Sequence, residues 1–420
     1  MRVIIVGAGI GGLTTALSLH AVGITDVTVV EAVSEILPLG VGINLLPHAV
    51  RELTELGLGD SLAERGVATS DLTYVDRQGS TIWSEPRGVG AGYRWPQYSI
   101  HRGRLQRLLL DETIRRLPPG SVRTGCRVSS TTTAGDLARL TWTEADSEVS
   151  ESADVVITAD GIKSAIRAAW HPEEGPPEWN GQIMWRAVSR VSPFLSGTSM
   201  VMAGDREQKF VACPIEAVQH DGSQLVNWIA EKAVEHSDIA QQDWNRRVEK
   251  DVFAPSFDSW SFDWLDVPAV ISAAETVFEY PMVDRPALET WVRGRVAQLG
   301  DSAHPTYPIG SNGSSQAIID ARVLAFGLAT LPIDDALRFY EHERLPRTRE
   351  LQRVNRAMGP ERVMQMVRER APGGFTDIHD VIDQVELEEV AAAYKRVAGF
   401  DPTALNDRAS WTPTSTETAR

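Results

Sequence analysis

The sequence predicts an α/β fold, in which a Rossmann-like dinucleotide-binding domain is interleaved with a β-sheet domain and followed by a C-terminal helical segment. Three observations lead to this prediction. The chain opens on a strand, a glycine-rich turn, a helix and a second strand. A strand-rich tract follows over residues 182–283, and the sequence beyond residue 330 is mostly helical and charged.

The N-terminal unit has the length and the pattern of a βαβ motif. Residues 3–6 are consecutive β-formers without polar alternation, which predicts a buried parallel strand. Residues 11–22 are rich in Ala and Leu and stop at Gly23, which predicts a helix. Residues 27–30 are expected to form a second buried strand, and this strand ends in Glu31.

Periodicity and turn residues predict the elements that follow. A hairpin is expected over residues 72–83, and strands between 122 and 158 are expected to be joined by a polar loop at 144–152. The remaining expected elements are helices over 48–56, 102–116 and 313–330 and strands over 155–157 and 294–299.

Composition restricts the classes of partner. The chain has 420 residues and a formal net charge of −16, which disfavours binding to nucleic acid. No apolar stretch is long enough to cross a bilayer, so no membrane partner is expected. The two cysteines do not make a disulfide framework, which fits a cytoplasmic protein. No metal site is expected, and the chain is expected to be a monomer or a homodimer.

The turn after the first strand reads G-x-G-x-x-G. Gly7 permits a tight turn, and Gly9 has no Cβ that would keep backbone amides away from a pyrophosphate. Gly12 allows the helix to pack closely on the strand, and Ile10 and Gly11 lie at the helix N-terminus that attracts phosphate. The carboxylate of Glu31 is placed to bind ribose hydroxyls. The alternative for such a motif is an ordinary glycine-rich turn.

Two later segments distinguish FAD from NAD as the dinucleotide. A predicted strand ends in Asp160-Gly161, although Asp-Gly taken alone is usually only a turn. Another predicted strand ends in Asp301, whose carboxylate could bind ribityl hydroxyls. The chain then runs through a glycine-rich turn over 310–313, where backbone amides could reach the flavin ring oxygen.

These motifs in this order resemble those of the flavoprotein aromatic hydroxylases, a family of single-component FAD-dependent monooxygenases. The resemblance implies FAD as cofactor, NADH or NADPH and O2 as co-substrates, and hydroxylation of a small aromatic substrate through a C4a-hydroperoxyflavin. It implies no catalytic acid or base, and His304 is interpreted as a structural histidine. The further cofactor contacts that it implies are Ala32, Gly42, Ile43, Arg102, Val128, Asp160, Gly161, Asp301, Pro308, Gly310, Ser311, Asn312 and Gly313.

The resemblance also implies limits for each domain. An FAD-binding domain is expected over residues 1–72, 100–181 and 285–350, and a substrate domain over 73–99 and 182–284. Residues 351–420 are expected to form C-terminal helices and a flexible tail, because the composition from Trp411 onward is typical of disorder.

A closer likeness is to the phenazine-hydroxylating members of the family. It implies a phenazine-type polycyclic substrate, with decarboxylation where a carboxylate is replaced. The alternatives are a hydroxylase of another bicyclic or tricyclic aromatic acid, a flavin halogenase, whose W-x-W-x-I-P segment is not found, or a protein that sequesters an aromatic ligand. The segments that carry the likeness are 38–44, 83–88, 96–103, 184–186 and 280–285.

The expected chemistry needs a dry pocket lined by aromatic side chains. Arg186 is a candidate partner for a substrate carboxylate, and its alternative role is an ordinary ion pair. Each aromatic candidate could instead be part of the packed core. The candidate wall residues are Trp83, Tyr98, Trp185, Trp228 and Tyr307.

Overall fold

The computed structural model describes residues 1–38, 40–234 and 246–414. Leu39, in the glycine-containing segment 38–44, and the last six residues of the predicted tail lie outside the described residues. Within the described ranges, the N-terminal βαβ unit lies at the centre of a six-stranded sheet of order β21-β22-β12-β1-β2-β8, parallel except for β21. Its strands are β1 (Arg2–Val6), β2 (Asp26–Val30), β8 (Val122–Arg123), β12 (Val155–Thr158), β21 (Val292–Arg293) and β22 (Val296–Gln298).

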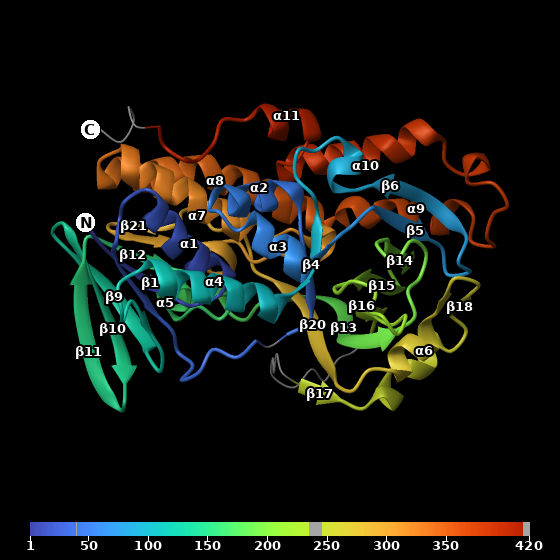
Figure 1. Cartoon of the computed structure of the whole chain (residues 1–420), viewed down its shortest axis with the longest axis horizontal. Coiled ribbons are helices and arrows are strands. Elements are labelled where there is room, and N and C mark those ends of the chain that lie inside the picture. The colour runs from blue at the N-terminus through green and yellow to red at the C-terminus, as the bar shows by residue number, and fades with distance from the viewer. Residues whose placement is uncertain (39, 235–245, 415–420) are drawn as a thin grey trace.

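Long helices cover one face of this sheet, and α1 packs between the sheet and α7 (Figure 1). About three quarters of the residues of α1 and α7 are buried, which explains why apolar residues occur on several sides of both helices. The helices on this side of the molecule are α1 (Ile10–Ala21), α2 (Pro47–Glu55), α3 (Gly59–Arg65), α4 (Arg102–Arg116), α7 (Gly313–Thr330) and α8 (Ile333–Arg356).

The other face carries a small antiparallel sheet of β9 (Arg127–Ala134), β10 (Leu137–Glu144) and β11 (Ser147–Ala153). The prediction of a polar loop over 144–152 is therefore wrong. The chain turns tightly at Ala145 and Asp146, both with positive φ, and then continues as β11. The polar residues belong to a strand that is largely open to solvent, whereas alternate residues of β10, such as Trp142, face the core.

An eight-stranded sheet forms the second half of the molecule as far as the structure describes it, with the order β17-β20-β13-β16-β15-β14-β5-β6. Only β14 and β5 pair in parallel. One face packs on an aromatic cluster under the short helix α6 (Val267–Ser272), and the other packs against the C-terminal helices. The strands are β5 (Asp71–Val75), β6 (Thr81–Pro86), β13 (Glu178–Val191), β14 (Met200–Gly204), β15 (Gln208–Pro214), β16 (Gln224–Ala233), β17 (Arg246–Val248) and β20 (Val277–Asp284).

A small antiparallel sheet joins the two halves, and it consists of β3 (Gly42–Leu45), β7 (Tyr98–His101) and β4 (Gly66–Ala68). The backbone amide of Gly42 donates to Oδ1 of Asn227 on β16 at 2.8 Å. The joining sheet is thereby fixed to the eight-stranded sheet.

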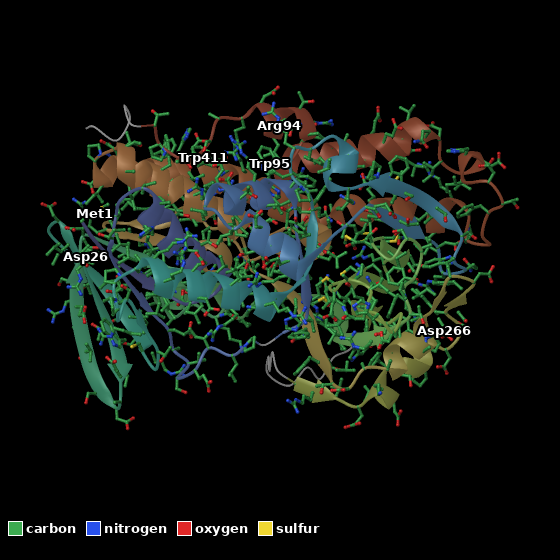
Figure 2. All side chains as sticks on the ribbon, in the orientation of Figure 1. Met1, Asp26, Arg94, Trp95, Asp266 and Trp411 are labelled. Carbon is green, nitrogen blue, oxygen red and sulfur yellow. The ribbon has the colours of Figure 1, made fainter. Side chains whose placement is uncertain are left out.

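The C-terminal segment crosses the eight-stranded sheet and then returns to the first half (Figure 1). Helices α9 (Arg362–Arg370) and α10 (Gln384–Ala398) cover the side of β5 and β6, and α11 (Pro402–Asp407) leads back toward α2. Trp411 packs edge-on against Phe326 and Phe339 at the ends of α7 and α8 (Figure 2). This packing corrects the expectation that disorder begins at Trp411, because an aromatic side chain and the buried network of Arg322 fix this part of the segment.

The predicted fold class is confirmed, while the domain limits remain a prediction. None of the helices in the described part of the chain has the length and apolarity that a membrane crossing requires.

Candidate active site

The glycine turn is tightly packed on its inner side and open on its outer side. Gly7 has φ +100°, and a Cβ there would lie 2.5 Å from the carbonyl oxygen of Ala159. A Cβ at Gly12 would lie 1.9 Å from the carbonyl oxygen of Gly7. By contrast, a Cβ at Gly9 would meet no described heavy atom within 4 Å apart from its chain neighbours. The space beside Gly9 therefore suits a ligand that approaches the backbone closely.

The same turn begins a helix whose N-terminal amides are free to bind an anion. Gly9 is the N-cap of α1 and provides no side-chain cap, and the first turn contains no acidic residue. The positive end of the helix is thus exposed beside the open space, as a pyrophosphate site requires.

Glu31 lies at the end of β2, directly beside this turn. Its carboxylate accepts hydrogen bonds from the backbone amides of Ala8 (2.8 Å) and Val33 (3.0 Å). These bonds hold the side chain, which is half-buried, at the edge of the open space, and Ala32 follows it in the chain. Val128, at the start of β9, packs against the apolar cluster below the same edge.

Asp160 supplies a buried acceptor next to the turn. Its Oδ2 accepts from the amide of Ala165 at 3.2 Å, whereas Oδ1 is buried and has no partner in the described residues. Burial raises the pKa of Asp160 to about 6, which is the expected cost of an incompletely paired carboxylate. Gly161, at φ +78°, has open space on its Cβ side. Both residues thus border a volume that protein atoms do not fill.

Asp301 follows β22 (Val296–Gln298) after two residues, and it is exposed. Surrounding protein raises its pKa through burial, yet the surface of its side chain remains accessible to solvent. Both properties hold for a carboxyl that lines an enclosed cleft. The guanidinium of Arg102 and the side chain of His304 are close enough to oppose the rise in pKa. A Cβ at Gly313 would be 3.9 Å from Oδ1 of Asp301, so the carboxyl faces the start of α7.

Arg167 fastens the loop of Asp160 to the loop of Asp301. This side chain, at 1% exposure, donates from Nη1 to the carbonyls of Ser302 (3.1 Å) and Ala303 (2.8 Å). Its Nη2 donates to the carbonyl of Pro286 and to the carboxylate of Glu174. The position of Arg167 in the helix α5 (Ala165–Trp170) after Asp160-Gly161 therefore has a structural reason.

The turn before α7 has an unusual backbone. Gly310 has φ +66° and Ser311 has φ +55°, a region that a residue with a side chain adopts at a cost. Asn312 is the N-cap of α7 without a side-chain cap, and no acidic residue follows in the first turn, which begins at Gly313. Pro308 precedes the turn. A second helix N-terminus is therefore open beside Asp301.

The C-terminal helix α10 supports this turn from behind. The hydroxyl of Tyr394 lies 3.2 Å from Nδ2 of Asn312 and 3.2 Å from Oδ1 of Asn355. A Cβ at Gly310 would lie 1.9 Å from that hydroxyl, so only glycine fits. Sequence reasoning missed Tyr394, because no pattern connects it with a turn that lies more than eighty residues earlier.

The joining strand β3 contacts the turn before α7. Gly42 is held through its amide by Asn227, and its carbonyl accepts from Nη2 of Arg186 at 3.1 Å. Ile43 follows and pairs with Ile100 of β7. Asn44 donates to Oγ of Ser311 at 3.2 Å, which ties β3 to the turn before α7.

Arg186 is a cation without a counterion. Its Nε is buried without a hydrogen-bond partner, and the side chain makes no ion pair in the part of the chain that the structure describes. Burial lowers the pKa of Arg186, and the charge of Arg102 adds to this effect. An arginine in such surroundings gains free energy by meeting an anionic ligand. This observation supports Arg186 as a carboxylate partner and disfavours its alternative role in an ion pair.

Trp185 and Trp228 do not lie on the same side as Arg186. Side chains alternate along a strand, so Trp185 points to the opposite face from its neighbour. There it stacks on Phe253 at 4.7 Å between ring centroids, while Nε1 of Trp228 donates to Oγ of Ser189 at 2.8 Å. The expectation that both tryptophans line the pocket does not fit this packing.

The other aromatic candidates are separated from one another. Tyr98 packs in the core of the first half, and Trp83 joins the cluster under α9. Only Tyr307 lies beside the turn before α7, in a cluster with Ile309 and Met184. Burial, together with nearby Asp284, raises the pKa of Tyr307 to about 12, so this phenol stays neutral. His304 is buried with Nε2 2.5 Å from Oδ2 of Asp320, which supports a structural role.

Open space beside Gly9 and Gly161 and the exposed residue Asp301 mark a region that we call the cofactor hollow, which runs from the glycine turn and Asp160 past Asp301 toward the 310–313 turn and Gly42. This order of donors and acceptors suits a dinucleotide cofactor. Residues 1–355 match the family described as an FAD binding domain, and the chain belongs to this family of FAD-dependent aromatic hydroxylases.

Named relatives agree with this assignment. The phenazine 1,6-dicarboxylic acid hydroxylase PhzS of Lysobacter antibioticus is 44% identical over 362 residues, which cover 84% of this chain and 89% of the relative. The 3-amino-4-hydroxybenzoate 2-monooxygenase PtnB3 of Streptomyces platensis is 32% identical over 383 residues, which cover 88% of this chain and 92% of the relative.

Among solved structures, Klebsiella pneumoniae HpxO complexed with FAD and uric acid superposes with a TM-score of 0.70 at 25% identity, covering 95% of this chain and 93% of that chain. The chain is therefore an FAD-dependent monooxygenase that hydroxylates an aromatic substrate.

Proposed function

We propose that this enzyme hydroxylates a phenazine-type polycyclic aromatic acid with electrons from NADH or NADPH and oxygen from O2. The observation that carries the proposal is Arg186 beside Gly42, because a half-buried cation with a buried Nε and no ion pair among the described residues favours a substrate with a carboxylate. The 44% identity to an enzyme named for a phenazine dicarboxylic acid supports the same substrate class.

We infer that FAD lies along the hollow. Its pyrophosphate would meet the turn from Gly7 to Gly12, and Glu31 would bind a ribose. Asp301 would hold the ribityl chain, and the ring would lie between Gly42 and the 310–313 turn. The open side of Gly9, the unpaired Oδ1 of Asp160 and the accessible carboxyl of Asp301 fit these roles.

The overall reaction balances in two forms. Simple hydroxylation converts an aromatic C–H, O2, NAD(P)H and one proton into a phenol, NAD(P)⁺ and water. Where the oxygen replaces a carboxylate, the ring–carboxylate bond breaks and CO2 leaves, and a second proton is consumed. Bound FAD supplies the transfer of electrons from NAD(P)H and the activation of O2 for attack by the ring.

The protein has to orient the ring and exclude water. Arg186 would hold the carboxylate, so that one edge of the ring faces the flavin. Met184, Met282, Ile309 and Tyr307 form a buried cluster next to the 310–313 turn and keep that region dry. The neutral phenol of Tyr307 adds no charge that would repel an anionic substrate.

Purified protein with bound FAD is expected to oxidise NADH slowly without substrate. Addition of phenazine-1-carboxylate or phenazine-1,6-dicarboxylate should accelerate NADH oxidation and O2 uptake at least about tenfold, because a bound ring completes the site. Mass spectrometry of the product distinguishes hydroxylation from decarboxylative hydroxylation. Stimulation by smaller bicyclic acids but not by phenazines would favour the alternative substrate class, and no stimulation by any aromatic acid would contradict the proposal.

Replacement of Arg186 tests its role as carboxylate partner. Arg186→Met should raise the Kd for a phenazine carboxylate about 10- to 100-fold, the range expected for a lost charge-assisted hydrogen bond of roughly 1.5–3 kcal/mol. The Kd is measured from the change in flavin absorbance during titration.

The matched control is Trp228→Phe, which lies on the neighbouring strand but on the opposite face of the sheet. It should lower the free energy of unfolding by about 1 kcal/mol through the lost bond to Ser189 and leave the Kd unchanged. Equal Kd values for Arg186→Met and the wild type would rule out the assigned role.

A further inference from the structure

We propose that Arg87 and Lys395 form a second anion site at the closed end of the substrate pocket, where they bind another carboxylate of the aromatic substrate. This inference rests on the proposed function and specifies its substrate as an aromatic dicarboxylate. Neither residue belongs to the cofactor hollow described above.

A small internal cavity of about 30 Å³ begins at the turn before α7, where Gly310 and Ser311 form part of its wall. The eight-stranded sheet supplies apolar walls through β5 and β14, and α10 closes the far side with Tyr394. The cavity also touches Leu46, directly after β3, whose first residue is the Gly42 that contacts Arg186. The cavity is thus adjacent to both protein segments that would flank the flavin ring.

The charged end of this cavity has an excess of positive charge. Glu85 on β6 pairs with Arg87, which directly follows this strand, and with Lys395 of α10, whose Nζ lies 2.9 Å from Oε2. Two cations therefore share one carboxylate. Arg87, and to a smaller extent Lys395, hold the pKa of Glu85 below its usual range, so this carboxylate stays charged and the three side chains together keep one net positive charge.

Arg87 still has an unused donor. Its side chain is only 10% exposed, and its Nε is buried with no hydrogen-bond partner among the described residues. A buried N–H of a charged group without a partner is costly, and an oxygen ligand in the cavity would remove that cost. The side chain of Tyr74 also lines the cavity and lies close to the same guanidinium.

The dimensions suit a carboxylate rather than a ring. A volume of about 30 Å³ has room for a group of one or two water-sized oxygens. The ring would lie toward Met200 and Met202, whose flexible side chains can adapt to a flat ligand. From Gly42 to Leu46 the strand advances roughly 13 Å, at about 3.3 Å per residue, which is comparable with the length of a tricyclic molecule.

Arg186 and the Arg87–Lys395 pair can therefore hold opposite ends of one substrate. The relative at 44% identity is named as a phenazine 1,6-dicarboxylic acid hydroxylase, a name that specifies an aromatic substrate with two carboxylates. A substrate with a single carboxylate would leave one of the two cationic sites without an anion.

The test compares three ligands with two variants. Lys395→Met and Arg87→Gln are titrated, as FAD-loaded full-length enzymes, with phenazine-1,6-dicarboxylate, phenazine-1-carboxylate and unsubstituted phenazine. The Kd for the dicarboxylate should rise at least about tenfold in each variant, as expected for a lost charge-assisted contact. The Kd for unsubstituted phenazine should change less than about twofold, and Arg87→Lys should recover part of the loss for the dicarboxylate.

A control variant and the alternative outcomes make the test specific. Arg370→Gln breaks an exposed ion pair with Glu386 on the same C-terminal segment and should leave all three Kd values unchanged. An equal loss for all three ligands would show that the cluster only supports the fold, and unchanged dicarboxylate binding would refute the site. If the wild type binds no phenazine acid, the proposed function fails as well, and that result is visible before any variant is made.

Discussion

Gly9→Val is expected to fold normally and to retain no FAD. The position is unusual among the turn glycines, because the protein leaves open space where the new side chain would project. The backbone of Gly9 is also extended, with φ −76°, which valine adopts without strain. A valine there would occupy the space inferred for the pyrophosphate and weaken FAD binding at least about 100-fold, or roughly 3 kcal/mol.

Flavin content per protein, measured by absorbance after purification, tests this expectation. The thermal midpoint of the apoprotein should match that of wild-type apoprotein. Gly12→Val is the contrasting variant, because its side chain would overlap the carbonyl oxygen of Gly7 and should destabilise the fold itself. A normal flavin content in Gly9→Val would show that the pyrophosphate lies elsewhere.

Arg167→Met is expected to be among the most destabilising single changes in the described chain. It would remove the ion pair of Arg167 with Glu174. It would also remove the hydrogen bonds that Arg167 donates to the carbonyls of Ser302, Ala303 and Pro286. Breaking a buried pair of this kind costs about 3–5 kcal/mol. The loops that contain Asp160 and Asp301 would also lose the hydrogen bonds that connect them, so FAD affinity should fall together with the free energy of unfolding.

Urea denaturation of holo and apo forms separates the two effects. The loss in the apo form reports the buried pair, and the additional loss in the holo form reports weaker FAD binding. Arg115→Met, which removes an exposed pair with Glu112, should leave the free energy of unfolding almost unchanged. An effect of Arg167→Met as small as that of Arg115→Met would contradict the proposed fastening.

The cofactor half of the molecule is readily predictable, because its requirements are local. The glycine turn, the buried strands and the Ala/Leu-rich helix each depend on backbone geometry or burial within a few neighbouring residues. The expected helices over 102–116 and 313–330 agree with α4 and α7 for the same reason.

The substrate half is less predictable, because the pairing of its strands determines which face of the sheet each side chain occupies. Sequence alone does not say which face of β13 meets the hollow. It therefore could not show that Arg186 lies on that face and that Trp185 lies on the other. Asn227, Tyr394 and Lys395 act on residues far away in the chain, and no local pattern marks them. The strand β11 was predicted as a loop, because its polar residues face solvent and do not show an alternating pattern.

The closed end of the cavity lies partly beyond the residues that the family model matches. The family match ends at residue 355, whereas Pro360, Tyr394, Lys395 and Phe400 all contribute to the cavity wall. Mutations that reshape this wall can therefore accumulate without altering the glycine turn, Asp160 or Asp301. Tyr394 also bonds to Asn312 at the start of α7, so substitutions at Pro360, Lys395 and Phe400 should alter the cavity wall with less effect on the cofactor turn than a change of Tyr394.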